Sequence, residues 1–236
     1  MSFFPLLAIA LLAQPRQPVA ELVSFDRDSA ERVFPGFRIE SVDDGKNQSN
    51  VAEFLGHTFA RYPAESLMRE LRSVFVVRRM WWKDVEFGGT HNAGEGGIIL
   101  SPSVAITDES WTDHTFHHEL AHLIMARHGA EFPRAEWTAT NAQAYGHAAD
   151  ANGGYAALVN GEVGTSFVPA LNDVGLLSTY GSASFDEDWA CYGEAILSDD
   201  PAFWSLVAKY PRVRAKARMA IDFYRKIFPG VRLPDA

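Results

Sequence analysis

The residues of this chain best suited to chemistry lie in one short segment, His118-Glu119-Leu120-Ala121-His122. Successive residues of an α-helix turn by about 100°, so two histidines four positions apart lie on one face. Their imidazoles can bind a single metal ion, and Glu119 beside them can contact a water molecule on that ion. The pattern predicts a helix that carries two ligands and the general base of a hydrolytic zinc site.

The residues around the two histidines are apolar. Leu120, Ala121, Leu123 and Ile124 carry no charge, and Phe116 precedes the pair. Dry surroundings strengthen a metal site and orient its ligands. Two buried histidines and a buried glutamate without a partner would instead be costly. The flanks therefore favour a buried metal helix over a pair of ordinary core histidines.

A third ligand must come from elsewhere, because catalytic zinc takes three protein ligands and one water. His128 lies ten residues after His118, as in the H-E-x-x-H-x-x-G-x-x-H motif, but Met125 stands where that motif requires glycine. A helix that continues through Met125 turns His128 about 240° from His122, away from the metal. We expect His128 in the last turn of the helix, with Gly129 as its cap.

A second candidate, Glu187, lies in residues 184–197, where the apolar pattern predicts another buried helix. Glu187, Cys191 and Glu194 are spaced i, i+4 and i+7 and share one stripe of that helix. A carboxylate in an otherwise apolar stripe requires a cation. The alternative is that the acids at 186–188 only stabilise the helix N-terminus, where negative charge is favourable. Cys191 is the third candidate, although a lone buried cysteine is more often a small hydrophobic residue. Glu187 is the preferred third ligand.

Together the two segments resemble the gluzincin arrangement of zinc metallopeptidases, with H-E-x-x-H on one helix and E-D-W-A on a later one. More narrowly, they resemble zinc-binding metallopeptidases of bacterial secreted proteins and lipoproteins. In those proteins a stretch like 175–181 precedes the second helix. The resemblance covers roughly residues 95 to 225.

The resemblance implies a role for each of five side chains. The ligands of Zn²⁺ would be His118, His122 and Glu187, and Glu119 would be the base. Tyr180, seven residues before Glu187, would hydrogen-bond the reacting carbonyl.

One position departs from the resemblance. The related proteins carry an acidic residue four positions after the third ligand, where it orients a ligand histidine, and here that residue is Cys191. Such support matters for metal affinity and activity. Asp188, Glu194 and Asp113 are the candidates to replace it.

The composition fits one domain. The chain has 236 residues, of which 47% are hydrophobic and 12% aromatic, so it can bury a substantial core. Its net charge of −9 argues against nucleic-acid binding. We expect two basic groups, at residues 78–83 (Arg78, Arg79 and Lys83) and from Arg212 to Arg218, to be solvated. One cysteine excludes an internal disulfide.

The N-terminal segment indicates export. Residues 2–13 are uncharged, too short to span a bilayer, and typical of a signal-peptide core, although no Lys or Arg precedes them. A buried N-terminal helix is the alternative. We predict a signal peptide and linker over residues 1–20 and a secreted or periplasmic protein with no stable membrane span.

We expect residues 21–236 to form a single catalytic domain of the α+β, zincin-like type. A small sheet would pack on the active-site helix in a lobe that ends near residue 128, and a mainly helical lobe would follow. The pattern predicts helices over 50–60 and 63–73, strands over 74–77, 85–87 and 97–100, and a flexible loop over 88–97. Residues 97–100 would be either an edge strand that pairs with an extended peptide or a core strand.

The apolar periodicity is weaker in the C-terminal lobe. Residues 131–172 show no period and predict a long insertion that borders a cleft, with Trp137, Tyr145 and Tyr155 more suited to packing than to substrate contact. Residues 201–227 predict one amphipathic helix, ended by Pro229 and Gly230.

The predicted function is zinc-dependent hydrolysis of peptide bonds in a peptide or protein substrate. One alternative is a binding protein, with or without zinc, that has no turnover. Another is a hydrolase of small amides or cell-wall peptides with the same site. Glu119 favours catalysis, because a purely structural metal site needs no base. We expect His117 to be structural, although a different rotation of the helix would bring His114 or His117 near the cleft.

Overall fold

The computed structural model describes residues 21–102, 108–142, 147, 153–161 and 164–234. The predicted signal peptide and Tyr145 lie outside these residues. In the described part of the chain, no helix combines the length and the apolar character needed to cross a bilayer.

The N-terminal lobe contains two small sheets. The larger has four strands in the order β1 (Val23–Ser24), β3 (Ser73–Val76), β7 (Gly97–Leu100) and β6 (Gly89–Asn92). The first three strands are parallel and β6 is antiparallel to β7. The smaller sheet is antiparallel and consists of β2 (Arg38–Glu40), β4 (Arg79–Trp82) and β5 (Val85–Phe87).

Three helices accompany these sheets: α1 (Arg27–Val33), α2 (Gly45–Phe59) and α3 (Ala64–Glu70). Helices form in both segments predicted, 50–60 and 63–73. The first, α2, begins earlier because Asp44 caps it by accepting from the N–H of Lys46, and the second, α3, ends at Glu70, since Ser73 already belongs to β3. The strands predicted over 74–77 and 85–87 are confirmed to within one residue.

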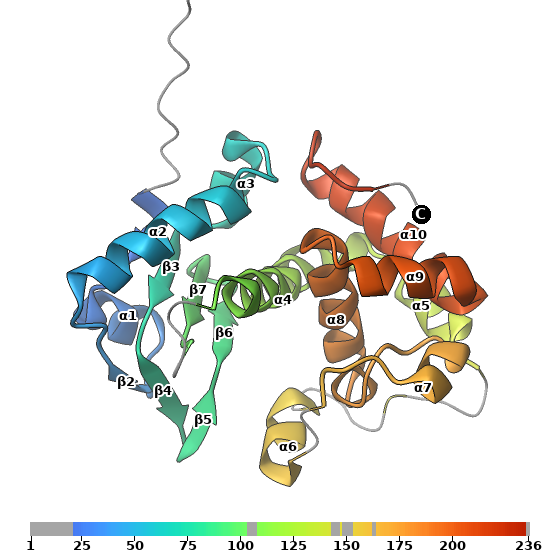
Figure 1. Ribbon diagram of the computed structural model, residues 1–236, viewed down its shortest axis with the longest axis horizontal. Coiled ribbons are helices and arrows are strands. Elements are labelled where there is room, and N and C mark those ends of the chain that lie inside the picture. The colour runs from blue at the N-terminus through green and yellow to red at the C-terminus, as the bar shows by residue number, and fades with distance from the viewer. Residues whose placement is uncertain (1–20, 103–107, 143–146, 148–152, 162–163, 235–236) are drawn as a thin grey trace, which may run out of the picture.

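The long helix α4 (Glu109–His128) carries the H-E-x-x-H segment and lies between the two lobes (Figure 1). Asp108 caps its N-terminus by accepting from the N–H of Trp111 at 2.9 Å. The helix continues through Met125, as expected, and ends at His128. Gly129 then opens a short 3₁₀ turn, η2 (Gly129–Glu131).

The loop predicted over residues 88–97 is wrong, because β6 forms within them. The strand predicted over 97–100 is confirmed, and of its two alternatives the core strand is the one observed, because β7 lies between β3 and β6 with all four residues buried. A Cβ at Gly88 would lie 2.9 Å from the ring of Trp111, and one at Gly89 would lie 2.7 Å from Thr115. Glycine therefore allows β6 to lie directly against α4, and β6 is the edge strand beside the site.

The C-terminal lobe is helical. It consists of α5 (Arg134–Thr140), α6 (Gly153–Asn160), α7 (Pro169–Val174), η3 (Tyr180–Ser182), α8 (Phe185–Leu197), α9 (Pro201–Lys209) and α10 (Pro211–Ile227). The single helix predicted over 201–227 is wrong. Pro211 disfavours a helical conformation of the residue before it, so Tyr210 is extended and a new helix starts at Pro211.

The aromatic core of this lobe surrounds Trp189 of α8. Its ring stacks on Tyr224 of α10 at 5.2 Å, and its indole N–H donates to the carbonyl of Ala121 in α4 at 2.8 Å. Trp137, expected to pack, is fully buried beside Trp189. These contacts fix α8 between α4 and α10.

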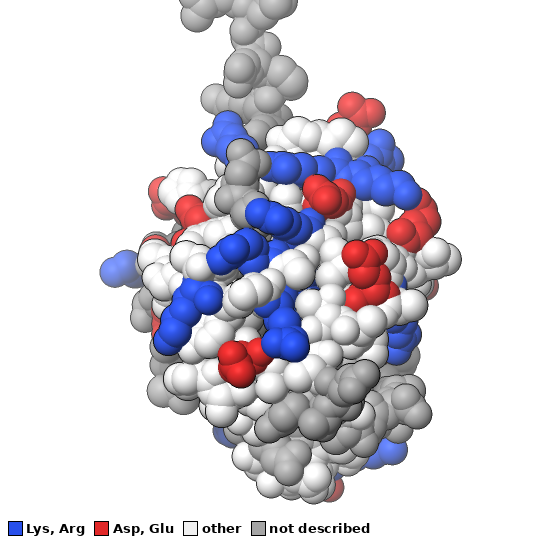
Figure 2. Space-filling view, turned by 90° about the vertical axis from the view of Figure 1, so that its right-hand side faces the viewer, with Lys and Arg blue, Asp and Glu red and all other residues white. Residues whose placement is uncertain are grey.

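Basic side chains gather on the surface of the C-terminal lobe, although the chain as a whole is acidic (Figure 2). The expectation that residues 212–218 are a solvated face is nevertheless wrong for Lys216. This side chain is fully buried, and its Nζ lies 2.6 Å from Oδ2 of the equally buried Asp188. The same carboxylate oxygen accepts from Trp137 Nε1 at 2.8 Å, so a network of polar contacts holds α10 and α5 to α8.

Replacing Lys216 with methionine should destabilise the protein by roughly 3–5 kcal/mol, because it leaves the carboxylate of Asp188 buried without its cation. Urea denaturation measures this loss. The matched control is Lys226→Met, which removes an exposed ion pair with Glu131 and should cost less than about 1 kcal/mol. Equal losses in the two variants would contradict the role given to the buried pair.

Candidate metal centre

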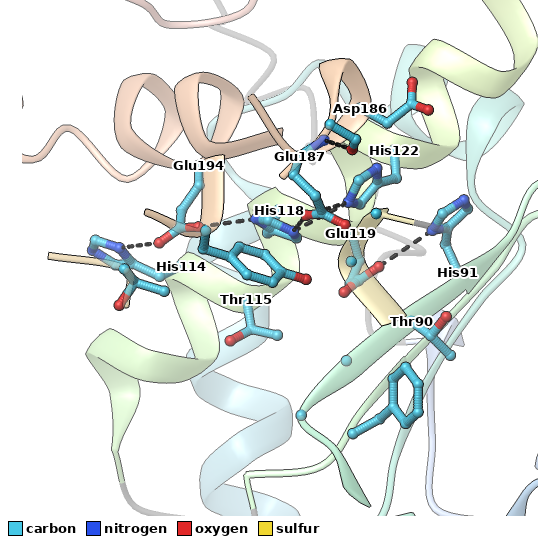
Figure 3. Close-up of a pocket in the computed structure, with 18 of the residues that line it drawn as sticks. Thr90, His91, His114, Thr115, His118, Glu119, His122, Asp186, Glu187 and Glu194 are labelled. Atoms are coloured by element: carbon cyan, nitrogen blue, oxygen red, sulfur yellow. Dashed lines mark hydrogen bonds and ion pairs between the residues drawn. The ribbon is translucent and has the colours of Figure 1, made fainter. Parts of the chain in front are cut away.

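Three side chains from two helices converge on one point. His118 and His122 come from α4 and Glu187 comes from α8 (Figure 3). Glu187 Oε2 lies 3.1 Å from His118 Nε2 and 3.4 Å from His122 Nε2, and the two Nε2 atoms are 3.1 Å apart. Donor atoms around a tetrahedral zinc ion lie about 3.3 Å apart, given bonds of roughly 2.0–2.1 Å. The three residues can therefore hold a metal ion.

Another carboxylate of α8, that of Glu194, orients His118 through the ring nitrogen Nδ1. Its Oε2 lies 3.1 Å from His118 Nδ1, and its Oε1 lies 3.0 Å from His114 Nδ1. An ionised carboxylate only accepts hydrogen bonds, so Nδ1 of His118 carries a proton, and Nε2 is the nitrogen that would bind a metal ion. Of the three residues considered as replacements for the missing acid at position 191, Glu194 is the one that contacts a ligand histidine.

The charges of the site favour a cation. Burial alone would lower the pKa of His118, but the carboxylates of Glu187 and Glu194 outweigh it and raise this pKa well above its usual range. Burial alone would raise the pKa of Glu187, but His122 and His118 hold it below its usual range. The buried carboxylates thus favour a positive charge between the three donor atoms. Two imidazoles and a carboxylate suit a divalent transition metal, zinc among them.

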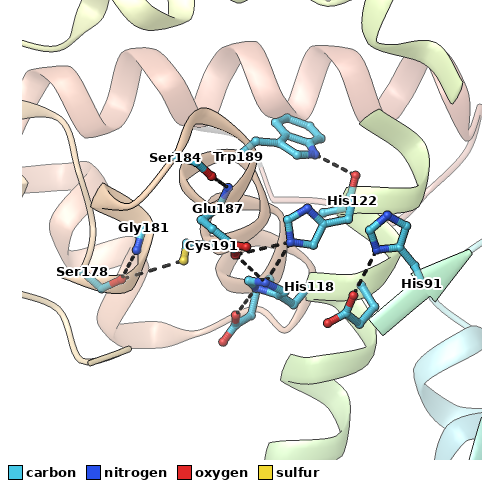
Figure 4. A network of polar contacts seen from close by, with 12 residues as sticks. His91, His118, His122, Ser178, Gly181, Ser184, Glu187, Trp189 and Cys191 are labelled. Carbon is cyan, nitrogen blue, oxygen red and sulfur yellow. Dashed lines mark hydrogen bonds and ion pairs between the residues drawn. The ribbon is translucent and has the colours of Figure 1, made fainter. Parts of the chain in front are cut away.

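The other proposed ligands point elsewhere. His128 Nε2 lies 3.0 Å from Glu70 Oε2, on the side of α4 expected from an unbroken helix. Cys191 is buried, with its Sγ 3.8 Å from Ser178 Oγ (Figure 4). Burial raises the pKa of this thiol well above its usual range, which disfavours the thiolate that a metal would need.

Two of the remaining acids serve the fold. Asp113 accepts from Thr58 Oγ1 at 2.7 Å, and Asp188 belongs to the network with Lys216. His117 is fully buried, with its Nδ1 2.8 Å from the hydroxyl of Tyr62, in the structural place expected for it.

Glu119 faces the edge strand, and its Oε2 lies 3.2 Å from Nδ1 of His91 in β6. The ring of His91 stacks on that of the candidate ligand His122 at 5.2 Å, with an angle of 12° between the planes. Sequence reasoning missed His91 because it lies in a segment interpreted as a glycine-rich loop. The alternation of Gly89 and His91 was the available signal, since it places both residues on one face of a strand.

Tyr180 lies beside the ligands, with its ring 5.8 Å from that of His118. Burial raises the pKa of its phenol, and the nearby carboxylates of Glu187 and Glu119 raise it further. The phenol therefore stays neutral and can donate a hydrogen bond. Gly154 of α6 covers this corner of the site, because a Cβ there would collide with Glu187 Oε1 and lie 3.1 Å from the hydroxyl of Tyr180.

The site opens into a cavity of about 970 Å³. Its polar lining contains the three candidate ligands and Glu119, and its apolar lining includes Phe87, Trp111, Tyr155 and Leu158. Tyr155 stacks on Phe87 at 6.5 Å and contacts Trp82 at 5.4 Å. It therefore packs, as expected, but it does so in the wall of the cleft.

Comparison with protein-family models, with curated proteins and with solved structures finds no match to this chain. The described residues form a mixed α/β fold with a buried His118, His122 and Glu187 group that can bind a metal ion. Function must therefore be argued from the geometry of the site.

Glu187→Ala should remove tight metal binding, because it leaves two ligands where three are needed. Metal content after reconstitution with Zn²⁺ and dialysis should fall from about one ion per chain to nearly none. His128→Ala is the control and should keep the ion. The reverse pattern would show that His128 supplies the third ligand.

Glu194→Gln should weaken metal binding about 10–100-fold, because the amide cannot accept from both His114 and His118. Competition with a chromogenic chelator measures the affinity. Glu136→Gln, an exposed acid on α5, is the matched control. Equal affinity in the two variants would remove the orienting role from Glu194.

Proposed function

We propose that this protein is a zinc-dependent hydrolase of peptide bonds. The observation that carries the proposal is the position of Glu119, which shares one cavity with the metal-binding group and lies one residue from a ligand on the same helix. A bound zinc ion would supply a water of lowered pKa and would polarise the scissile carbonyl. A site that only stored or displayed a metal would have no use for a carboxylate at this place.

The protein's own residues supply the proton transfers and the hydrogen bonds. Glu119 accepts a proton from the attacking water and later delivers it to the leaving amine. The neutral phenol of Tyr180 donates to the carbonyl oxygen as negative charge develops there. Glu194 keeps His118 in the tautomer that directs Nε2 at the metal.

The edge strand β6 is suited to bind the substrate, the role first considered for β7. Ser101 donates to the carbonyl of Gly88 at 2.6 Å, so these two residues form a hydrogen-bonded pair. Hydrogen-bonded and non-bonded pairs alternate along an antiparallel ladder, so the N–H and C=O groups of Gly89 and His91 point away from β7. An extended peptide can pair with them beside Glu119.

Glu119→Gln should keep the metal and lower peptide hydrolysis by about 10²–10⁴-fold, because the amide cannot accept the proton. Turnover of a mixed peptide library by the zinc-loaded protein, followed by mass spectrometry, measures the effect. An equal rate in wild type and variant would disprove the assignment of the base.

The library also separates the proposal from its alternatives. Peptides that bind to the wild-type protein without being cut would indicate a binding protein. Cleavage confined to small amides or cell-wall peptides would narrow the substrate and keep the mechanism.

A further inference from the structure

The edge strand also carries a side chain with a place in the reaction. We propose, on the basis of the function proposed above, that His91 is a positioning residue that holds the carboxylate of Glu119 for proton transfer. The substrate would pair with the backbone of the same residue. His91 would then connect the strand that binds the peptide with Glu119, the general base.

The contact with Glu119 is direct. His91 Nδ1 lies 3.2 Å from Glu119 Oε2 (Figure 3). Among the described residues, no other side chain forms a hydrogen bond with the Glu119 carboxylate. The carboxylate can only accept, so the donor is the Nδ1–H of His91. The other oxygen, Oε1, faces Gly89, where a Cβ would lie 2.9 Å from it.

The ring of His91 is itself held in place. Its stacking on His122 fixes its plane, and the backbone of His91 lies opposite Ile98, a fully buried residue of the interior strand β7. His91 is thus anchored by the sheet on one side and by a ligand ring on the other. A donor with so little freedom restrains the carboxylate that it binds.

The arrangement predicts an effect on turnover rather than on substrate affinity. Pairing of a peptide with β6 uses the backbone of His91, which any side chain leaves in place. Displacement of a catalytic group by about 1 Å can cost 10²-fold in rate. Removal of the donor should therefore lower kcat and leave KM nearly unchanged.

The variants are His91→Leu, which removes the donor, and His91→Asn, whose side-chain amide places an N–H near the position of Nδ1. With the zinc-loaded protein, His91→Leu should lower kcat about 10–100-fold at unchanged KM and unchanged zinc content. His91→Asn should recover most of that loss. His57→Leu, on the exposed face of α2, is the matched control and should behave as wild type.

A readout without turnover tests the same claim. In crystal structures of the metal-free proteins, the Glu119 carboxylate should keep its place in His91→Asn and leave it in His91→Leu. If the wild-type protein hydrolyses no peptide, the proposed function fails while the crystal structures still decide whether His91 places Glu119. An active His91→Leu with unchanged kcat, an equal loss in both variants, or a Glu119 that stays in place in His91→Leu would each overturn the role of His91.

Discussion

The close approach of α4 and α8 is the constraint on which the site depends. A Cβ at Gly193 would lie 2.7 Å from that of Ala121, so the absence of a side chain allows the two helices to touch. The indole of Trp189 hydrogen-bonds to a carbonyl of α4 at the same crossing. At this short separation a glutamate on one helix reaches two histidines on the other, whereas a wider gap would leave two imidazoles and a distant acid.

Charge fixes α8 from both sides. Glu187 and Glu194 face the imidazoles of α4, while Asp188, the next residue after Glu187, faces Lys216 of α10. The helix therefore carries buried carboxylates on opposite faces, each matched by a positive or potentially positive partner. Its rotation about its own axis is restricted by these partners, and that rotation decides where the third ligand points.

The sequence predicted the parts of the site that depend on local spacing. His118 and His122 share a face because of helical geometry. Met125, in place of a glycine, indicated that the helix continues past them and directs His128 away from the site. Glu194 was only one of three candidates, because its contact with His118 depends on how two helices cross. The strand β6 was missed because its glycines were interpreted as a loop. The burial of Lys216 was missed because lysine is rarely buried unless it is paired, and its partner Asp188 lies on another helix.

Gly154 shows how space alone can constrain a position. It contributes no functional group, yet any side chain there would strike a carboxylate oxygen of Glu187, and α6 or Glu187 would have to shift. A side chain at position 154 therefore either moves α6 away from this corner of the site or moves Glu187 away from the two histidines. Position 154 is therefore restricted by the space around it and not by any chemical group that it contributes.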